Sequence, residues 1–313
     1  WERPIYFTGG SYEDSEYIWM KDYLQLDGLV YKLVPIKTSI DANPYEMGRI
    51  DSDLMYNIVK EWSWGNSNSN KIYHDPETRK NSISFRSNLS RLSEVLIDED
   101  KYEQAEEIID LAFSKMPIDY YGYYSLWTPF VKGYYEINRD DKAQEIVKKL
   151  SFKYSDRLNY YSSLEIFNQY NVGEEIISDI ERFRNLIETI KASGEKDILS
   201  EQIKSFISGS EKFNYIYGEY DFYISLSDFI ISLVELNQLE YSRSILDKIE
   251  EQLIRRVSVF SNIDQDEQVY YIEGITSDIN QYSRLISQIE IYDVELHNDY
   301  DKNLKEMLSK MVE

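Results

Sequence analysis

The chain has 313 residues, 42% of them hydrophobic and 15% aromatic, which suffices for a folded protein with a buried core. Its 57 Asp and Glu outnumber its 34 Lys and Arg, for a formal charge of −23. Nucleic acid and anionic lipid surfaces would repel such a chain, so neither is an expected partner. Because the chain has no cysteine, disulfides, thiolate metal sites and thiol catalysis are excluded.

The first 50 residues predict a small β-α-β unit. Residues 3–7 and 29–37 are rich in β-branched and aromatic side chains and are bounded by Gly and Pro, which is typical of strands. Residues 15–28 place apolar side chains along one helical side and end in Gly28. We therefore expect a first domain at residues 1–50.

Helical periodicity dominates from residue 51 onward, which predicts a second domain at 51–313. Its first helix, at 51–65, opens with Asp51 and closes with Gly65. The most apolar stretch, 222–236, contains an aspartate and is too short to span a bilayer.

Three segments of this second domain align on a small residue. They are "YEQAEEIID" at 102–110, "DDKAQEIVK" at 140–148 and "LEYSRSILD" at 239–247. Each follows an apolar-periodic helix and a short polar turn, so each predicts a helix-turn-helix unit with a close helix approach at the small residue.

The fold class expected from this pattern is mainly α. It consists of degenerate tetratricopeptide-like helical hairpins, an α-α superhelix, preceded by the β-α-β unit. The tetratricopeptide period and glycine position are not kept, and residues 151–217 are too divergent to align. An irregular helical bundle remains the alternative.

Two motifs have both a chemical and a structural interpretation. Asp51 and Asp53 resemble the Asp-x-Asp metal clamp of nucleotide-sugar transferases, but carboxylates at a helix start also cap its free N–H groups, and we favour capping. The "FTGGS" segment at 7–11 could cradle a phosphate, but it lacks a Walker lysine and acidic residues follow it, so a plain turn is favoured.

The remaining candidates for chemistry are aromatic or isolated. The 29 tyrosines cluster, as in "YYGYY" at 120–124, and we expect most of them to pack and a minority to contact a partner. No catalytic partner of His74 or His297 can be recognised from its spacing in the sequence, and we expect both histidines at the surface. We predict no catalytic residue, no metal site and no cofactor.

Five segments in roughly the first half of the chain carry a resemblance to a known family, which rests mainly on the second of them. They are "RPIYF" at 3–7, "DYLQLDGLVYKLVPIK" at 22–37, "WGN" at 64–66, "RSNLSRLSEVL" at 86–96 and "AFSKMP" at 112–117. These segments resemble the C-terminal soluble part of a bacterial family of multi-spanning membrane proteins. That family is similar to protein O-mannosyltransferases of the lipid-linked-sugar type and has an animal relative in the endoplasmic reticulum.

This resemblance implies that catalysis belongs to the membrane part of a parent glycosyltransferase, and that this chain is a non-catalytic soluble domain. It would lie on the periplasmic side, tethered by transmembrane segments outside this sequence, and bind an acceptor protein or organise the complex. The chain begins at Trp1 without an initiator Met or leader pattern, and we expect it to be an excised fragment.

In tetratricopeptide arrays the first helix of each hairpin lines the concave face. This geometry predicts a groove that holds a protein, a peptide or a glycan and is lined by Ser90, Glu94, Tyr124, Thr128, Lys132 and Tyr135.

Two other classes of protein remain open. One is a stand-alone tetratricopeptide-type glycan- or protein-binding module of the bacterial cell envelope, such as an outer-membrane lipoprotein. The other is a self-contained enzyme, which only the "FTGGS" segment supports.

Overall fold

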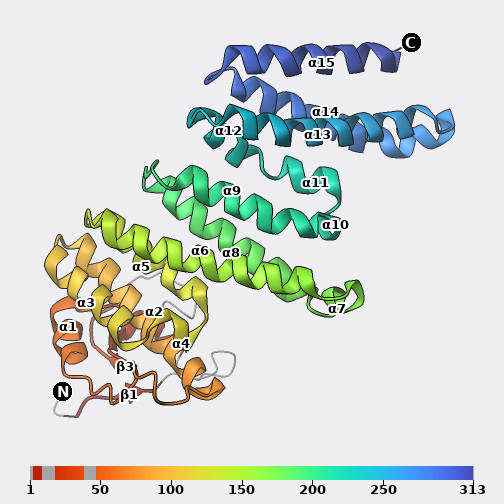
Figure 1. Cartoon of the computed structure of the whole chain (residues 1–313). Helices are drawn as coiled ribbons and strands as arrows, with labels where there is room; N and C mark the ends of the chain where they lie inside the picture. The colour runs from red at the N-terminus through yellow and green to blue at the C-terminus, as the bar shows by residue number, and fades with distance from the viewer. Residues whose placement is uncertain (1–2, 9–17, 39–46, 313) are drawn as a thin grey trace. The chain divides into compact units, whose positions relative to one another are not determined.

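The computed structural model describes residues 3–8, 18–38 and 47–312 and shows a mainly α-helical protein with a small N-terminal sheet, as predicted (Figure 1). The chain divides into two compact units, 1–150 and 151–313. This division falls inside α6 (Asp140–Ser163), and the expected domain boundary near residue 50 stays a prediction. Among the described residues, no helix combines the length and the apolar character required to cross a bilayer.

Both strand pairs of the N-terminal sheet are antiparallel, so the expected β-α-β arrangement is wrong. Its strands β1 (Tyr6–Phe7), β2 (Leu24–Asp27) and β3 (Val30–Leu33) lie in the order β1-β3-β2. The only helical turn among its described residues is the 3₁₀ segment η2 (Ile18–Tyr23).

The residues of β2 fall within the helix that was predicted at 15–28. Leu24 and Leu26 fit a helical side, but they also alternate with polar residues at the strand period of two. Asp27 pairs with Val30 across a two-residue loop in which Gly28 has φ +71°, and such a loop joins antiparallel strands, whereas parallel strands need a long crossover. A Cβ on Gly28 would also lie 3.0 Å from the Trp62 ring.

In the first unit, the sheet is followed by helices whose bounds are α1 (Ser52–Lys60), α2 (Pro76–Asp98), α3 (Tyr102–Lys115), α4 (Ile118–Tyr121), η4 (Tyr124–Trp127), α5 (Thr128–Glu136) and the first part of α6. Helix α5 packs against both α2 and α3. Ala105, Ala112 and Ala143 are fully buried, as expected for close approach. Gly133 allows α5 to pack closely against α3, because a Cβ at this position would lie 3.0 Å from Ile109 Cδ1.

The second unit continues the helical pattern through the segment that could not be aligned. Its helices after α6 are α7 (Ile166–Asn171), α8 (Gly173–Ala192), α9 (Leu199–Ser210), η5 (Glu211–Phe213), α10 (Asn214–Tyr217), α11 (Glu219–Ile224), α12 (Ser227–Glu235), α13 (Leu239–Ser261), α14 (Gln265–Ile289) and α15 (Val294–Val312). Successive helices pack as neighbours in the pairs α8 with α9, α12 with α13, and α14 with both α13 and α15.

The three aligned segments share one turn. Asp100, Asn138 and Asn237 have φ of 58°, 57° and 56°, and each precedes the aligned small residue by the same number of positions. The residue that follows the positive-φ residue donates its N–H to a carbonyl oxygen in the last turn of the first helix. The acceptor is an apolar residue in all three turns. These bonds measure 2.8 Å to Leu96, Tyr134 and Leu233. The predicted helix-turn-helix units are therefore confirmed as hairpins closed by one Schellman motif.

We expect Asn138→Ala to lower the free energy of unfolding by about 1 kcal/mol. Both residues carry a Cβ that is strained at positive φ, but only Asn can offset this strain by local hydrogen bonds of its side chain. Asn138→Gly should not destabilise, since glycine adopts this conformation freely. Urea unfolding of both variants measures the difference. Equal losses in the two variants would show that the Asn side chain, and not its backbone angle, matters.

Candidate functional site

The N-terminal sheet is held on α2 by side chains that donate to backbone carbonyl oxygens. The Arg91 guanidinium donates to the oxygens of Met47 and Gly48, at 3.0 and 2.8 Å. The Asn88 amide donates to the oxygen of Gly28 at 2.8 Å. Hydrogen bonds from a charged donor are among the stronger ones, so these contacts fix the sheet to the first long helix.

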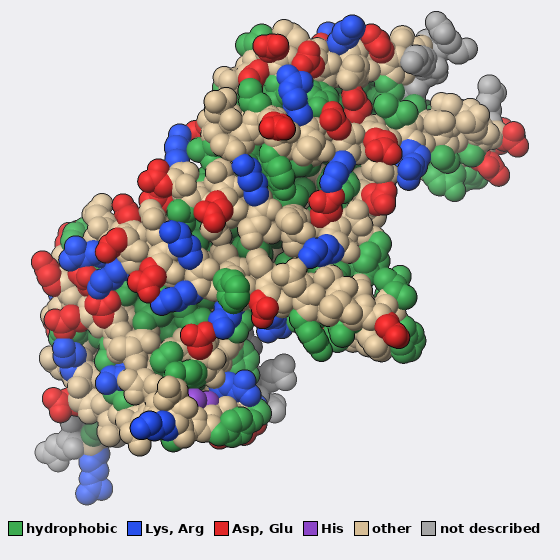
Figure 2. Space-filling view, viewed as in Figure 1, with side chains coloured by type: hydrophobic (Ala, Val, Ile, Leu, Met, Phe, Trp, Pro, Cys, Tyr) green, Lys and Arg blue, Asp and Glu red, His purple; other side chains and the backbone are tan. Residues whose placement is uncertain are grey.

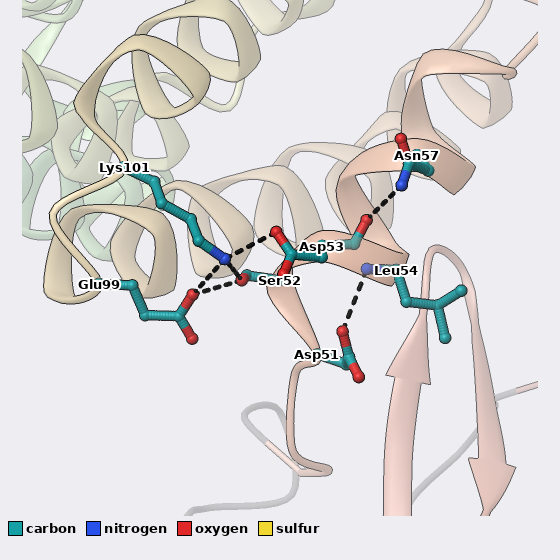
Figure 3. A network of polar contacts seen from close by, with 7 residues as sticks. All are labelled: Asp51, Ser52, Asp53, Leu54, Asn57, Glu99 and Lys101. Carbon is teal, nitrogen blue, oxygen red and sulfur yellow. Dashed lines mark hydrogen bonds and ion pairs between the residues drawn. The ribbon is translucent and has the colours of Figure 1, made fainter.

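Asp51 caps α1, which confirms the favoured interpretation of this motif (Figure 3). Its backbone is extended, and its carboxylate accepts from the Leu54 N–H at 3.1 Å. This is the geometry of an N-cap, in which a side-chain oxygen satisfies one of the free N–H groups of the first turn.

Asp53 points away from the cap and pairs with a lysine (Figure 3). Lys101 Nζ lies 2.7 Å from Asp53 and 2.8 Å from Glu99, and Ser52 also donates to Glu99. Hydrogen bonds from Lys101 and Ser52 hold the pKa of Glu99 below its ordinary value. The two carboxylates of the motif therefore face different partners, Asp51 the Leu54 N–H and Asp53 the Lys101 ammonium. Within the described part of the chain, no group of three His, Cys, Asp or Glu side chains is placed to hold a metal ion.

The phosphate cradle considered at 7–11 rests on Gly9, Gly10 and Ser11, which lie outside the described residues.

His74 is buried, which corrects the expected surface position. Its ring stacks on Tyr120 with centroids 5.4 Å apart, and Nε2 lies 3.1 Å from the Ser69 carbonyl oxygen. His297 is half-buried, with Nδ1 at 2.9 Å from the Ile286 oxygen. Both imidazoles therefore take part in packing and backbone hydrogen bonding.

The six residues of the predicted groove divide by exposure. Ser90, Thr128 and Tyr135 are buried, so they offer a partner little area. Glu94 and Tyr124 are half-buried and make polar or ring contacts within the protein. Lys132 is exposed, and its ammonium lies 3.4 Å from Glu136. The groove stays a prediction, and its accessible part is Glu94, Tyr124 and Lys132.

A buried arginine, Arg86, holds the "YYGYY" turn and is not among the residues predicted from the sequence. Its Nη1 donates to the Gly122 oxygen at 2.7 Å and its Nη2 to Ser82 Oγ at 2.8 Å. The guanidinium also lies over the Trp127 ring, 5.2 Å from its centroid. Burial lowers the pKa of Arg86 to about 10.

The signal for Arg86 is present in the sequence. It lies on the stripe of α2 formed by Ser82, Leu89, Ser93 and Leu96, whose spacing of three and four residues marks the buried side. A charged residue on such a stripe must find hydrogen-bond partners inside the protein.

Together these observations define an α-helical hairpin protein whose small N-terminal sheet is fixed on its second helix. Residues 1–54 match a family model described as TMEM260-associated domain 2, a domain associated with a membrane protein. The match ends in the first turn of α1, so it covers the sheet and the capping residue. No curated protein matches the chain. No solved structure matches it either.

We expect Asp51→Ala to lower the free energy of unfolding by about 1 kcal/mol through loss of the N-cap. Asp51→Asn should stay close to the parent protein, because Asn caps equally well. Thermal unfolding of the two variants measures this. If Asn is as harmful as Ala, the charge at the helix terminus outweighs the hydrogen bond.

We expect Arg86→Met to lower the free energy of unfolding by about 2 kcal/mol, because the half-buried Gly122 carbonyl oxygen loses its donor. The matched control is Lys80→Met, an exposed position of the same helix, which should change little. Chemical denaturation compares the two. A neutral Arg86→Met would mean that burying the guanidinium costs as much as its hydrogen bonds contribute.

Proposed function

We propose that this chain is a non-catalytic extramembrane domain of a multi-spanning membrane protein that resembles protein O-mannosyltransferases. It lies on the periplasmic side of a bacterial membrane, binds acceptor protein or organises the complex, and uses tetratricopeptide-like hairpins to do so. The observation that carries the proposal is the match of residues 1–54 to a domain associated with a membrane protein.

The packing of the first unit supports this assignment. Arg91 and Asn88 fix the matched segment on α2, and α2 in turn packs against α3 and α5. A membrane part joined to the matched segment would therefore present the first hairpins in a fixed way, which lowers the entropy lost when a partner binds.

The proposed contact surface is the accessible part of the predicted groove, which residues of α2, η4 and α5 line and which we call the α2–α5 groove. A carboxylate, a phenol and an ammonium, from Glu94, Tyr124 and Lys132, can satisfy the polar groups of an extended polypeptide. Catalysis would reside in the membrane part, so this chain alone should not transfer a sugar.

One observation favours a stand-alone glycan- or protein-binding module of the cell envelope as a second candidate. Aromatic rings stack on sugars, and several aromatic side chains in and next to α7 are exposed, namely Tyr160, Phe167 and Tyr170. The gene sequence upstream of Trp1 separates the two candidates. Many hydrophobic segments support the membrane enzyme, whereas a single lipobox cysteine supports the module.

We expect a photoreactive residue at Lys132 to crosslink to secreted acceptor proteins when the protein is expressed from its own gene in its own cells. The matched control is Lys148, an exposed lysine of α6, which should not enrich them. Mass spectrometry of the crosslinked products measures the enrichment. Equal capture at both positions, or sugar transfer from lipid-linked mannose by the purified chain, would contradict the proposal.

A further inference from the structure

One end of the α13–α14 hairpin in the second unit carries an unusual run of apolar side chains. Residues 269–272 are Val, Tyr, Tyr and Ile, and all four are exposed, with Tyr270 84% and Val269 71% accessible. Successive residues of a helix point about 100° apart, so four in a row surround it. This turn of α14 is therefore apolar on all sides, and such an exposed apolar surface is typical of an interaction site.

A cavity opens beside this run, between α13 and α14, with a volume of about 520 Å³. Its walls are mainly apolar, and Figure 2 shows hydrophobic side chains at this end of the hairpin, at the right of the view, with acidic ones beside them. The apolar lining consists of Val259, Phe260, Ile263, Tyr271 and Ile275. A Cβ built on Gly274, which also lines the cavity, would meet no atom within 4 Å.

The charges around the cavity are predominantly negative. Arg256 is already occupied, because it pairs with Asp278 and Asp221 at 2.8 and 2.9 Å and lies 4.6 Å from the Tyr220 ring centroid. Arg255 has carboxylate neighbours at 3.8 Å.

Three exposed carboxylates on α14 lack such a partner. Asp266, Glu267 and Glu273 form no ion pair with any residue that the structure describes. Glu267 lines the cavity itself. The rim can therefore pair with added positive charge.

We propose that this hairpin end is the docking site for an amphipathic, basic helix of a partner protein. An apolar side chain of that helix enters the cavity, its neighbours cover residues 269–272, and Lys or Arg side chains pair with Asp266, Glu267 and Glu273. Charge complementarity selects this occupant, since the acidic rim would repel anionic lipid and a second copy of the same surface. The site is separate from the α2–α5 groove and does not depend on the function proposed for it.

Gly274 offers a variant that blocks the cavity without removing any contact. The glycine is helical, without positive φ, and its Cβ position is open, so Gly274→Phe places a ring in the cavity. Gly274→Ala is the matched control, because it also adds a Cβ and raises the helix propensity without filling the space. Thermal unfolding of both variants verifies that the fold is kept.

The test measures binding of two labelled peptides by fluorescence anisotropy. One is a Leu/Lys amphipathic helix and the other its Leu/Glu counterpart, each about 18 residues long. We expect the Leu/Lys peptide to bind the full chain and Gly274→Ala alike. Its affinity should fall by about tenfold or more for Gly274→Phe and for the triple variant Asp266→Asn, Glu267→Gln, Glu273→Gln. The Leu/Glu peptide should not bind.

Four outcomes would overturn the proposal. Equal binding of both peptides, or unchanged affinity for Gly274→Phe, would show that the cavity and its rim do not select the ligand. Flotation of the chain with phosphatidylcholine vesicles, lost in Gly274→Phe, would assign the surface to lipid. Sedimentation of the chain as a dimer, again lost in Gly274→Phe, would assign it to a second copy.

Discussion

Each of the three aligned hairpins depends on a single residue with positive φ between its two helices. In the turn at Asn138, the N–H of the following residue, Arg139, closes on the oxygen of buried Tyr134, and the carbonyl oxygen of Arg139 accepts the first hydrogen bond of the next helix, from Ala143. One residue thus ends one helix and starts the other. This fixes the register at which Ala143 meets its neighbours, and Ala105 and Ser242 are placed in the same way and equally buried.

This constraint explains why the hairpins could be predicted from sequence. The alignment on a small residue found three positions that share a turn, because turn, apolar anchor and small residue are local and keep a fixed spacing. The N-terminal sheet was harder, since Leu24 and Leu26 satisfy two periods at once and only the Gly28 turn distinguishes them. Longer-range relations, such as the approach of Gly133 to Ile109, leave no local pattern in the sequence.

The polar residues divide in a similar way. Asp51 could be identified as a cap because capping is a local rule, and its partner Leu54 lies within the same turn. The partner of Asp53 is Lys101, which lies in the turn that begins α3, and no spacing rule joins the two. Arg86 donates to Gly122 in a separate element, so only its position on a buried stripe could have singled it out. The sequence alone does not distinguish the accessible residues of the predicted groove from the buried ones, because their exposure depends on how α5 packs against α2.

The distribution of paired charges connects the composition to the proposed partners. In the first unit, carboxylates such as Glu106 and Glu107 meet lysines or arginines of neighbouring helices, so part of the acidic excess is neutralised inside the fold. The segment from residue 250 to 278 contains seven Asp and Glu but only two Arg. Three of these carboxylates border an exposed apolar run. Apolar exposure favours association, whereas like charge opposes association with another acidic surface. The two together restrict the partner of this hairpin to an apolar surface that carries positive charge.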